Sequence, residues 1–300
     1  MILQQPLTDN LELIARQVVE GFIIGLHKSP FHGFSVEFAE HRLYNPGDPL
    51  RHIDWRVYGR TDKLFIKRFE EETNLRCCVV LDTSSSMYFP LDDKKLSKLQ
   101  FSCVAAASLL QLLKRQLDAA ALVKFDSQVN YFSDCRSAHS HYRMLMNELQ
   151  RTLETTSENK VTNAAKALHL VAEQMHKRSL VVVFSDMMDD SDNIEDMFSA
   201  LQHLRYNKHE VILFHVVDGT QELEFEFENR PYEFVDMETG DRIKLQPQQI
   251  KEQYISRMRD FQIMIENRCH QYQIDRVAVD LSKPVDEVLH AFLIKRNKLM

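Results

Sequence analysis

The chain has 300 residues, 44% of them hydrophobic and 27% charged, which is the balance of a globular protein with room for a substantial core. Its formal net charge of −7 disfavours nonspecific binding to nucleic acids. No apolar run approaches the roughly 18 residues of a membrane-spanning helix. Residues 1–10 lack the pattern of a signal peptide, and the five cysteines show no zinc-binding or C-x-x-C spacing. We therefore expect reduced thiols in a cytoplasmic protein.

The first 72 residues form a segment of their own kind. Apolar side chains at helical spacing predict a helix over 11–26. The stretch that follows is rich in aromatics, arginines and turn signals, with strand-like alternation at 33–38 and 64–69. Between those strands lie Arg51, Asp54, Trp55 and Arg60. They indicate either internal ion pairs of a small β-rich segment or a surface on which a partner docks.

From residue 73 to residue 300 the pattern changes to alternating strands and helices. This alternation is typical of a doubly wound, mostly parallel α/β sheet flanked by helices. Apolar runs predict strands at 77–81, 119–125, 129–132, 180–184, 210–217 and 275–281. Helices are predicted at 94–116, 137–154 with Ser137 as its cap, 164–176, 191–206, 247–272 and 284–298. Residues 221–246 break this rhythm and predict a β-hairpin insertion.

The strand at 77–81 ends abruptly in Asp82, and hydroxyls follow at Ser84 and Ser86. Ligand sites in open α/β sheets lie at the carboxyl ends of strands, where this D-x-S-x-S falls. One carboxylate and two neutral oxygens suit a hard cation such as Mg²⁺. The same residues could instead form a capped, serine-rich turn.

Two further positions extend this group of oxygens. Thr162 precedes a predicted helix, and Asp186 directly follows the apolar strand at 180–184. Because the carboxyl ends of parallel strands share one rim, we expect these residues to meet. The sequence therefore predicts an octahedral site with one open position, formed by Asp82, Ser84, Ser86, Thr162 and Asp186. An acidic group from a partner would complete it.

This spacing resembles the metal-ion-dependent adhesion site (MIDAS) of von Willebrand factor A domains. Met187 stands after Asp186, where adhesive A domains commonly have glycine. Residues upstream of Asp82 carry a second pattern, which consists of Gly33, Glu37-Phe38, 42–48, 51–55, Arg60, Lys67 and Phe69-Glu70. This pattern is similar to the signature of the bacterial family catalogued as domain of unknown function 58. The resemblance covers about residues 33–293. It implies a von Willebrand A-like domain that works with MoxR-type AAA+ ATPases in chaperone-like or metal-insertion roles, here in a form without the transmembrane helices of many relatives.

The same residues also admit enzymatic interpretations. A phosphatase of the haloacid dehalogenase type needs an acid where Ser84 stands. A metal-dependent phosphohydrolase or nuclease could use Asp82, Asp186 and Asp189, although no His or Lys is spaced to act as base. We therefore expect a non-enzymatic protein-interaction module that depends on Mg²⁺, or on Mn²⁺ or Ca²⁺ in its place. Its partners would be proteins that offer an acidic residue.

Overall fold

The structure is a computed structural model, and it describes residues 11–23, 36–44, 54–71, 75–91, 95–155, 164–188 and 191–299. The chain divides into two compact units. Residues 31–75 form the smaller unit, and residues 1–30 together with 76–300 form the larger one.

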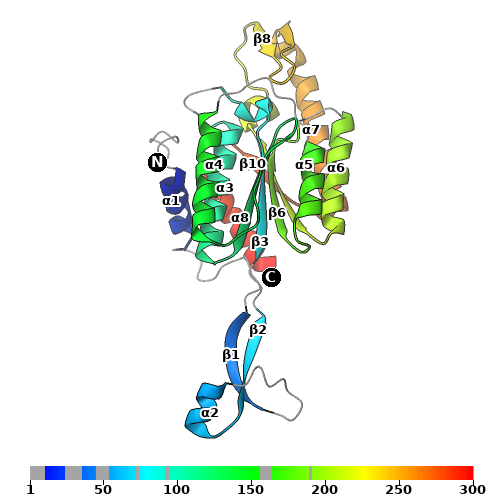
Figure 1. Cartoon of the computed structure of the whole chain (residues 1–300). Coiled ribbons are helices and arrows are strands. Elements are labelled where there is room, and N and C mark those ends of the chain that lie inside the picture. The colour runs from blue at the N-terminus through cyan, green and yellow to red at the C-terminus, as the bar shows by residue number, and fades with distance from the viewer. Residues whose placement is uncertain are drawn as a thin grey trace. The chain divides into compact units, whose positions relative to one another are not determined.

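A six-stranded sheet is the centre of the larger unit (Figure 1). Its order is β10–β7–β6–β3–β4–β5, and all neighbours are parallel except β4 with the edge strand β5. The strands are β3 (Arg76–Asp82), β4 (Ala119–Phe125), β5 (Val129–Phe132), β6 (Leu180–Ser185), β7 (Glu210–Val217) and β10 (Asp275–Asp280). The central strands β3 and β6 are buried on both faces, which their continuous apolar runs permit. The predicted doubly wound, mostly parallel α/β fold is confirmed.

Helices cover both faces of this sheet (Figure 1). On one face α3 (Lys98–Arg115) packs with α4 (His139–Glu154) and α8 (Val285–Leu299), and α1 (Leu11–Ile23) packs on α3. On the other face α5 (Ala164–Gln174), α6 (Ser191–Tyr206) and part of α7 (Pro247–Gln271) share a core with the sheet. Cys78 and Val80 belong to that core, so the intervening Val79 faces the opposite layer.

Helix α3 begins at a complete capping box. The Ser97 hydroxyl accepts the Gln100 N–H at 3.2 Å, and the Gln100 side chain accepts the Ser97 N–H at 2.9 Å. The Lys98 N–H donates to the carbonyl of Phe89, which anchors the preceding loop. These bonds fix the first turn of α3 and with it the buried side chain of Lys98.

The predicted insertion follows β7. It consists of the π-helical turn η3 (Gly219–Leu223) and a hairpin of β8 (Tyr232–Val235) and β9 (Arg242–Leu245), after which α7 begins with Pro247 at its first position. Aromatic rings hold the hairpin on α7, because Phe225 stacks on Phe234 and also contacts Tyr254 with centroids 4.3 Å apart.

The smaller unit pairs β1 (Val36–Leu43) with β2 (Phe65–Glu71) in antiparallel fashion, and α2 (Trp55–Thr61) lies between them in the chain. Asp54 caps α2, since its Oδ1 accepts the N–H groups of Arg56 and Val57 at 2.9 and 3.3 Å. Trp55 is 63% exposed and meets Tyr58 edge to face.

Some element boundaries differ from those predicted. Helix α1 lies in the larger unit although the sequence groups it with residues 1–72, because the Leu11 N–H donates to Gln150 and Glu12 accepts from Gln111. Ser137 is not the cap of α4, which begins after Ala138 without a side-chain cap. The first strand predicted at 33–38 lies at Val36–Leu43.

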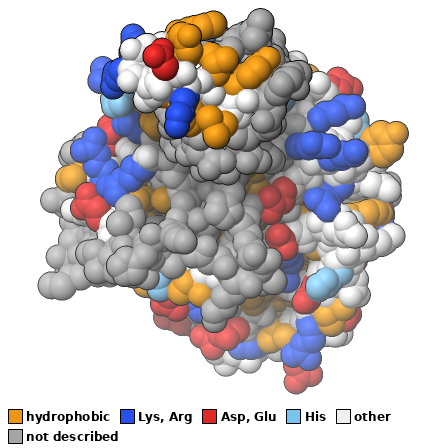
Figure 2. All heavy atoms as spheres, turned by 90° about the horizontal axis from the view of Figure 1, so that it is seen from below, with side chains coloured by type: hydrophobic (Ala, Val, Ile, Leu, Met, Phe, Trp, Pro, Cys, Tyr) orange, Lys and Arg blue, Asp and Glu red, His pale blue; other side chains and the backbone are white. Residues whose placement is uncertain are grey.

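The surface and the thiols agree with the bulk composition. Acidic and basic side chains lie interspersed on the described part of the face in Figure 2. All five cysteines are free thiols, and four of them are buried. None of the helices within the described ranges has both the length and the apolar character needed to cross a bilayer.

Candidate metal centre

Asp82 is the last residue of β3 and is fully buried. The backbone leaves the strand in a fixed direction, because both the N–H and the hydroxyl of Thr83 donate to the Phe125 carbonyl, at 2.8 and 2.7 Å. These bonds hold β3 beside β4 up to its final residue. Asp82 therefore lies at the carboxyl edge of the sheet, where open α/β folds place their ligand sites.

Ser84 and Ser86 bring two hydroxyls to the same edge. The Ser84 N–H donates to Asp82 Oδ1 at 2.9 Å, which closes a tight turn at the strand end. The two serine Oγ atoms are 3.0 Å apart. Ser84 is fully buried, and Ser86, in the 3₁₀ turn η2 (Ser85–Tyr88), is half-buried. The three oxygen-bearing side chains of the D-x-S-x-S stretch thus converge on one place.

The second carboxylate reaches this place from β6, which pairs with β3 in parallel. The Ser185 hydroxyl donates to Asp82 Oδ2 at 2.8 Å and accepts the Met187 N–H at 3.0 Å. Asp186 follows directly and is buried. The rim therefore brings together Asp82, Ser84, Ser86 and Asp186.

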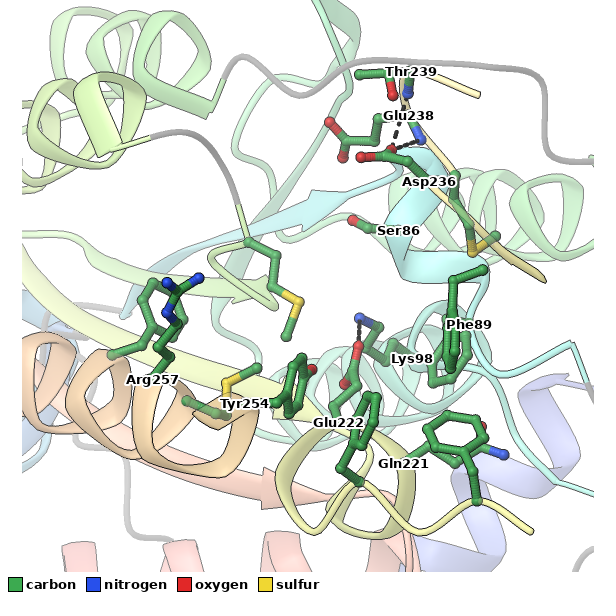
Figure 3. Close-up of a pocket in the computed structure, with 17 residues that line it drawn as sticks. Ser86, Phe89, Lys98, Gln221, Glu222, Asp236, Glu238, Thr239, Tyr254 and Arg257 are labelled. Atoms are coloured by element: carbon green, nitrogen blue, oxygen red, sulfur yellow. Dashed lines mark hydrogen bonds and ion pairs between the residues drawn. The ribbon is translucent and has the colours of Figure 1, made fainter. Parts of the chain in front are cut away.

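A buried lysine that is not among the predicted site residues lies in the same cluster. Lys98 Nζ is 2.6 Å from Asp186 Oδ2, and its side chain has no exposed surface. The same Nζ is 2.6 Å from Glu222 Oε1 (Figure 3). Burial alone would lower the pKa of this ammonium, but the attraction of the two carboxylates outweighs burial and raises it. Lys98 is therefore a cation at neutral pH, fixed between the end of β6 and the turn after β7.

Glu222 ties the inserted segment to this cluster. While its Oε1 meets Lys98, its Oε2 accepts the Asp218 N–H at 2.8 Å. Asp218 in turn caps η3 by accepting the N–H groups of Thr220 and Gln221, both at 2.9 Å. Burial raises the pKa of Glu222, and the charge of Lys98 acts against that rise. Both carboxylate oxygens are engaged, so the turn is held firmly against the rim.

The cluster carries more negative than positive charge. Two buried carboxylates, those of Asp186 and Glu222, contact the ammonium of Lys98, and the buried carboxylate of Asp82 lies close enough to Asp186 to be repelled by it. Burial, followed by the repulsion of Asp186, raises the pKa of Asp82 to about 7. A second cation at this rim would remove that repulsion.

His215 supports the end of β6 and is itself fully buried. Its Nε2 lies 2.9 Å from the Asp186 carbonyl oxygen, which can only accept, so Nε2 carries the proton and donates it. Its Nδ1 then accepts from Arg276 at 2.9 Å. Burial, with the nearby charge of Arg276, lowers the pKa of His215 to about 4. His215 is therefore a neutral structural group with both ring nitrogens engaged.

Met187 takes the conformation that glycine favours at this position. Its φ is +56°, in the left-handed region, where a side chain costs of order 1–2 kcal/mol. Its side chain is buried, and such burial stabilises by about 1.5–3 kcal/mol. The buried thioether thus offsets the backbone strain of the turn after Asp186.

The donor set fits a small, hard cation. Adjacent ligands of a Mg²⁺ octahedron lie about 3 Å apart, because each Mg–O bond is about 2.1 Å. The Ser84 and Ser86 hydroxyls have that separation, although a hydrogen bond between them gives the same distance. Across the ranges that the structure covers, no three His, Cys, Asp or Glu side chains are grouped to hold a metal. An ion at this rim would therefore depend on the hydroxyls.

Several predicted residues contribute nothing to this picture. Those that fall outside the described residues are Arg51, Thr162 and Asp189, and their roles stay predictions. Arg60 lies exposed in the last turn of α2, in the smaller unit with Asp54 and Trp55.

Solved structures with some likeness to the chain include BatB from Bacteroides thetaiotaomicron, at TM-score 0.47 and 15% identity over 75% of this chain and 100% of that one. The von Willebrand A domain of SpRpn10 gives TM-score 0.40 and 9% identity, over 72% of this chain and 94% of that one.

Two curated relatives are the uncharacterized proteins Rv1480 of Mycobacterium tuberculosis and Mb1516 of Mycobacterium bovis. Each is 23% identical to the chain over 211 residues, which are 69% of this chain and 63% of the relative. The chain thus spans less than two thirds of their length. The family model described as protein of unknown function DUF58 matches residues 40–263, most of the chain. The chain therefore belongs to the DUF58 family.

Proposed function

We propose that this protein is a metal-dependent protein-interaction module. Asp82, Ser84 and Ser86 would hold Mg²⁺ at the rim, with Asp186 and Thr162 completing the ligand set directly or through water. The bound ion would supply an electrophilic position that an Asp or Glu carboxylate of a partner can fill. The observation that carries the proposal is the pair of serine hydroxyls 3.0 Å apart beside the buried Asp82.

The charges of the surrounding side chains favour a metal site that binds a carboxylate of a partner protein. Lys98 already holds one oxygen of Asp186, so this carboxylate is partly neutralised. Asp82 is held by an N–H and a hydroxyl rather than by an ammonium. A cation at the rim would therefore meet one carboxylate that no ammonium neutralises, that of Asp82, among neutral oxygens, and it would retain affinity for a further carboxylate.

We extend the proposal to a MoxR-type AAA+ ATPase as a partner, in chaperone-like or complex-assembly work. The family resemblance supports this step, because relatives in the family are commonly encoded beside such ATPases. The proposed metal site would then bind an acidic residue either of the ATPase or of the protein on which this chain and the ATPase act together.

Phosphoester hydrolysis is the competing proposal, and the surroundings of the rim disfavour it. Lys98 stays protonated between two carboxylates, and His215 has both nitrogens engaged. Neither side chain can accept a proton from an attacking water. Among the described residues at the rim, a hydrolase would have to use a metal ligand as its base.

Titration calorimetry with Mg²⁺ and Mn²⁺ tests the metal claim. We expect saturable binding to the wild type and binding weakened about tenfold or more by Ser84→Ala, since one direct ligand is lost. Ser85→Ala is the matched control, because Ser85 is equally buried but lies between the two ligand positions. Folded wild-type protein that binds neither ion would refute the proposal. Turnover of a generic phosphoester with Mn²⁺, abolished by Asp82→Asn, would favour the hydrolase.

A further inference from the structure

A cavity of about 820 Å³ opens beside the metal rim (Figure 3). Ser86, Lys98 and Glu222 line it from the rim, while the inserted hairpin and helix α7 form its other walls. Its volume lies within the roughly 300–1,000 Å³ of sites that bind drug-sized ligands. A single side chain would leave most of it unfilled.

The walls of the cavity are apolar and adaptable. They are formed by Phe225, Phe227, Phe234, Tyr254, Met258 and Phe261. Phe234 and Met258 are only half-buried, so apolar surface is available at the opening. Aromatic rings offer large contact areas, and methionine side chains adjust to different partners. Such a surface suits bulky apolar side chains of a protein segment.

Polar groups surround this apolar centre. Figure 3 places Asp236 and Glu238 at the hairpin edge and Arg257 on helix α7. The Asp236 carboxylate is used locally, because its Oδ1 accepts the N–H groups of Glu238 and Thr239 at 2.8 and 3.0 Å. Protein-binding surfaces commonly have this arrangement of an apolar centre with polar groups at its periphery.

Ser86 connects the cavity with the metal rim. Its hydroxyl is a proposed metal ligand, and the same residue lines the cavity. A carboxylate that completes the metal shell beside Ser86 would therefore enter through the cavity. The residues next to that carboxylate in its own chain must then lie against the aromatic and methionine walls.

We propose that the cavity binds the bulky apolar flank of the segment whose Asp or Glu completes the metal shell. The ligand class is a protein segment with a carboxylate and an aromatic, Leu or Met side chain within about one helical turn of each other. This inference rests on the proposed function and adds to it a source of sequence selectivity. The metal would recognise the acid, and the cavity would select among acids by their neighbours.

Selection from a displayed library of random heptapeptides on the immobilised full chain tests the proposal, with elution by EDTA. We expect peptides that carry both an acid and a bulky apolar residue. Enrichment of acids without apolar neighbours would overturn the cavity inference and leave the metal-dependent function standing. No EDTA-eluted enrichment at all would overturn both, and enrichment of apolar peptides without an acid would overturn the shared site.

Variants then locate the binding of one enriched peptide by fluorescence anisotropy. Met237→Gln with Met258→Gln removes two apolar walls, one on the hairpin and one on α7. Ile243→Gln with Ile263→Gln is the matched control, because these exposed side chains lie on the same two elements outside the cavity lining. We expect the first pair to weaken binding about tenfold or more and the control to leave it unchanged. Equal affinity for both pairs would overturn the inference.

Discussion

Replacing Lys98 by Met removes the ammonium at the centre of the rim. The two side chains have similar length, so the space that Lys98 fills is kept, although its ammonium no longer lies over the Phe89 ring, 5.8 Å from the centroid. The carboxylates of Asp186 and Glu222, each 2.6 Å from Nζ in the wild type, lose their counter-charge in a place almost closed to water. The substitution therefore tests the electrostatics of the cluster with little change in shape.

Removing one partner of a buried ion pair costs about 3–5 kcal/mol, because the remaining charge is left uncompensated. That is a large part of the total stability of a typical domain, about 5–15 kcal/mol. The loss should depend on pH. Without Lys98, burial and the charge of Asp186 are left to raise the pKa of Glu222 above its ordinary 4.5. A carboxyl with a raised folded pKa loses stability as pH rises, so the deficit should be small near pH 4.5 and largest above neutrality.

Urea unfolding at pH 5 and pH 8, followed by circular dichroism, measures this deficit. Lys114→Met is the control, because Lys114 lies on the same helix and pairs with the partly exposed Glu12 at 3.7 Å. We expect that control to cost less than about 1 kcal/mol at either pH. If Lys98→Met at pH 8 lies within about 1 kcal/mol of the wild type, the buried charge cluster as described is refuted.

Three further predictions concern single residues. Asp82→Asn should stabilise the metal-free protein at pH 8 by up to about 3–4 kcal/mol and should not stabilise it at pH 4. The reason is that the pKa of Asp82 is raised from 3.8 to about 7, so ionisation of this carboxyl opposes folding between those values. Urea unfolding at both pH values measures the difference, and a variant less stable than the wild type at pH 8 would contradict this reasoning. Asp54→Ala should cost about 1 kcal/mol through loss of the α2 cap, visible as faster amide exchange in that helix. Trp55, the one tryptophan, is 63% exposed, so its fluorescence should be red-shifted and easily quenched by acrylamide.

The sequence predicts the parallel sheet, and it predicts that Asp82, Ser84, Ser86 and Asp186 lie together at one edge of it, for definite physical reasons. A strictly apolar strand such as β6 must be covered on both faces, which places it in the middle of a parallel sheet. Asp82 ends the central strand β3 and Asp186 directly follows the central strand β6, so both residues lie at one edge of the sheet. Local turn chemistry does the rest, because the Ser84 N–H returns to the Asp82 carboxylate only two residues away.

The sequence does not predict that Lys98 and Glu222 join this cluster, because their contacts link distant parts of the chain. Lys98 lies 88 positions from Asp186 and 124 positions from Glu222, and no local pattern joins them. One signal was present, because Lys98 shares a helical face with the apolar Phe101 and Ala105, where an unpaired ammonium could not be buried. Glu222 carries no such signal, since it opens an alternation of acidic and apolar residues, which does not indicate the turn η3.

Lys98 connects the proposed metal site with the apolar cavity. Asp186 directly follows the central strand β6, Glu222 lines the cavity, and Lys98 forms an ion pair with each of them. Any cation that draws on Asp186 must compete with this ammonium, and any change in that pairing acts on the turn that carries Glu222. Phe225, three residues further along, is part of the cavity wall and of the aromatic cluster under the hairpin. Metal binding at this rim, as proposed, would therefore be coupled to the shape of the apolar cavity.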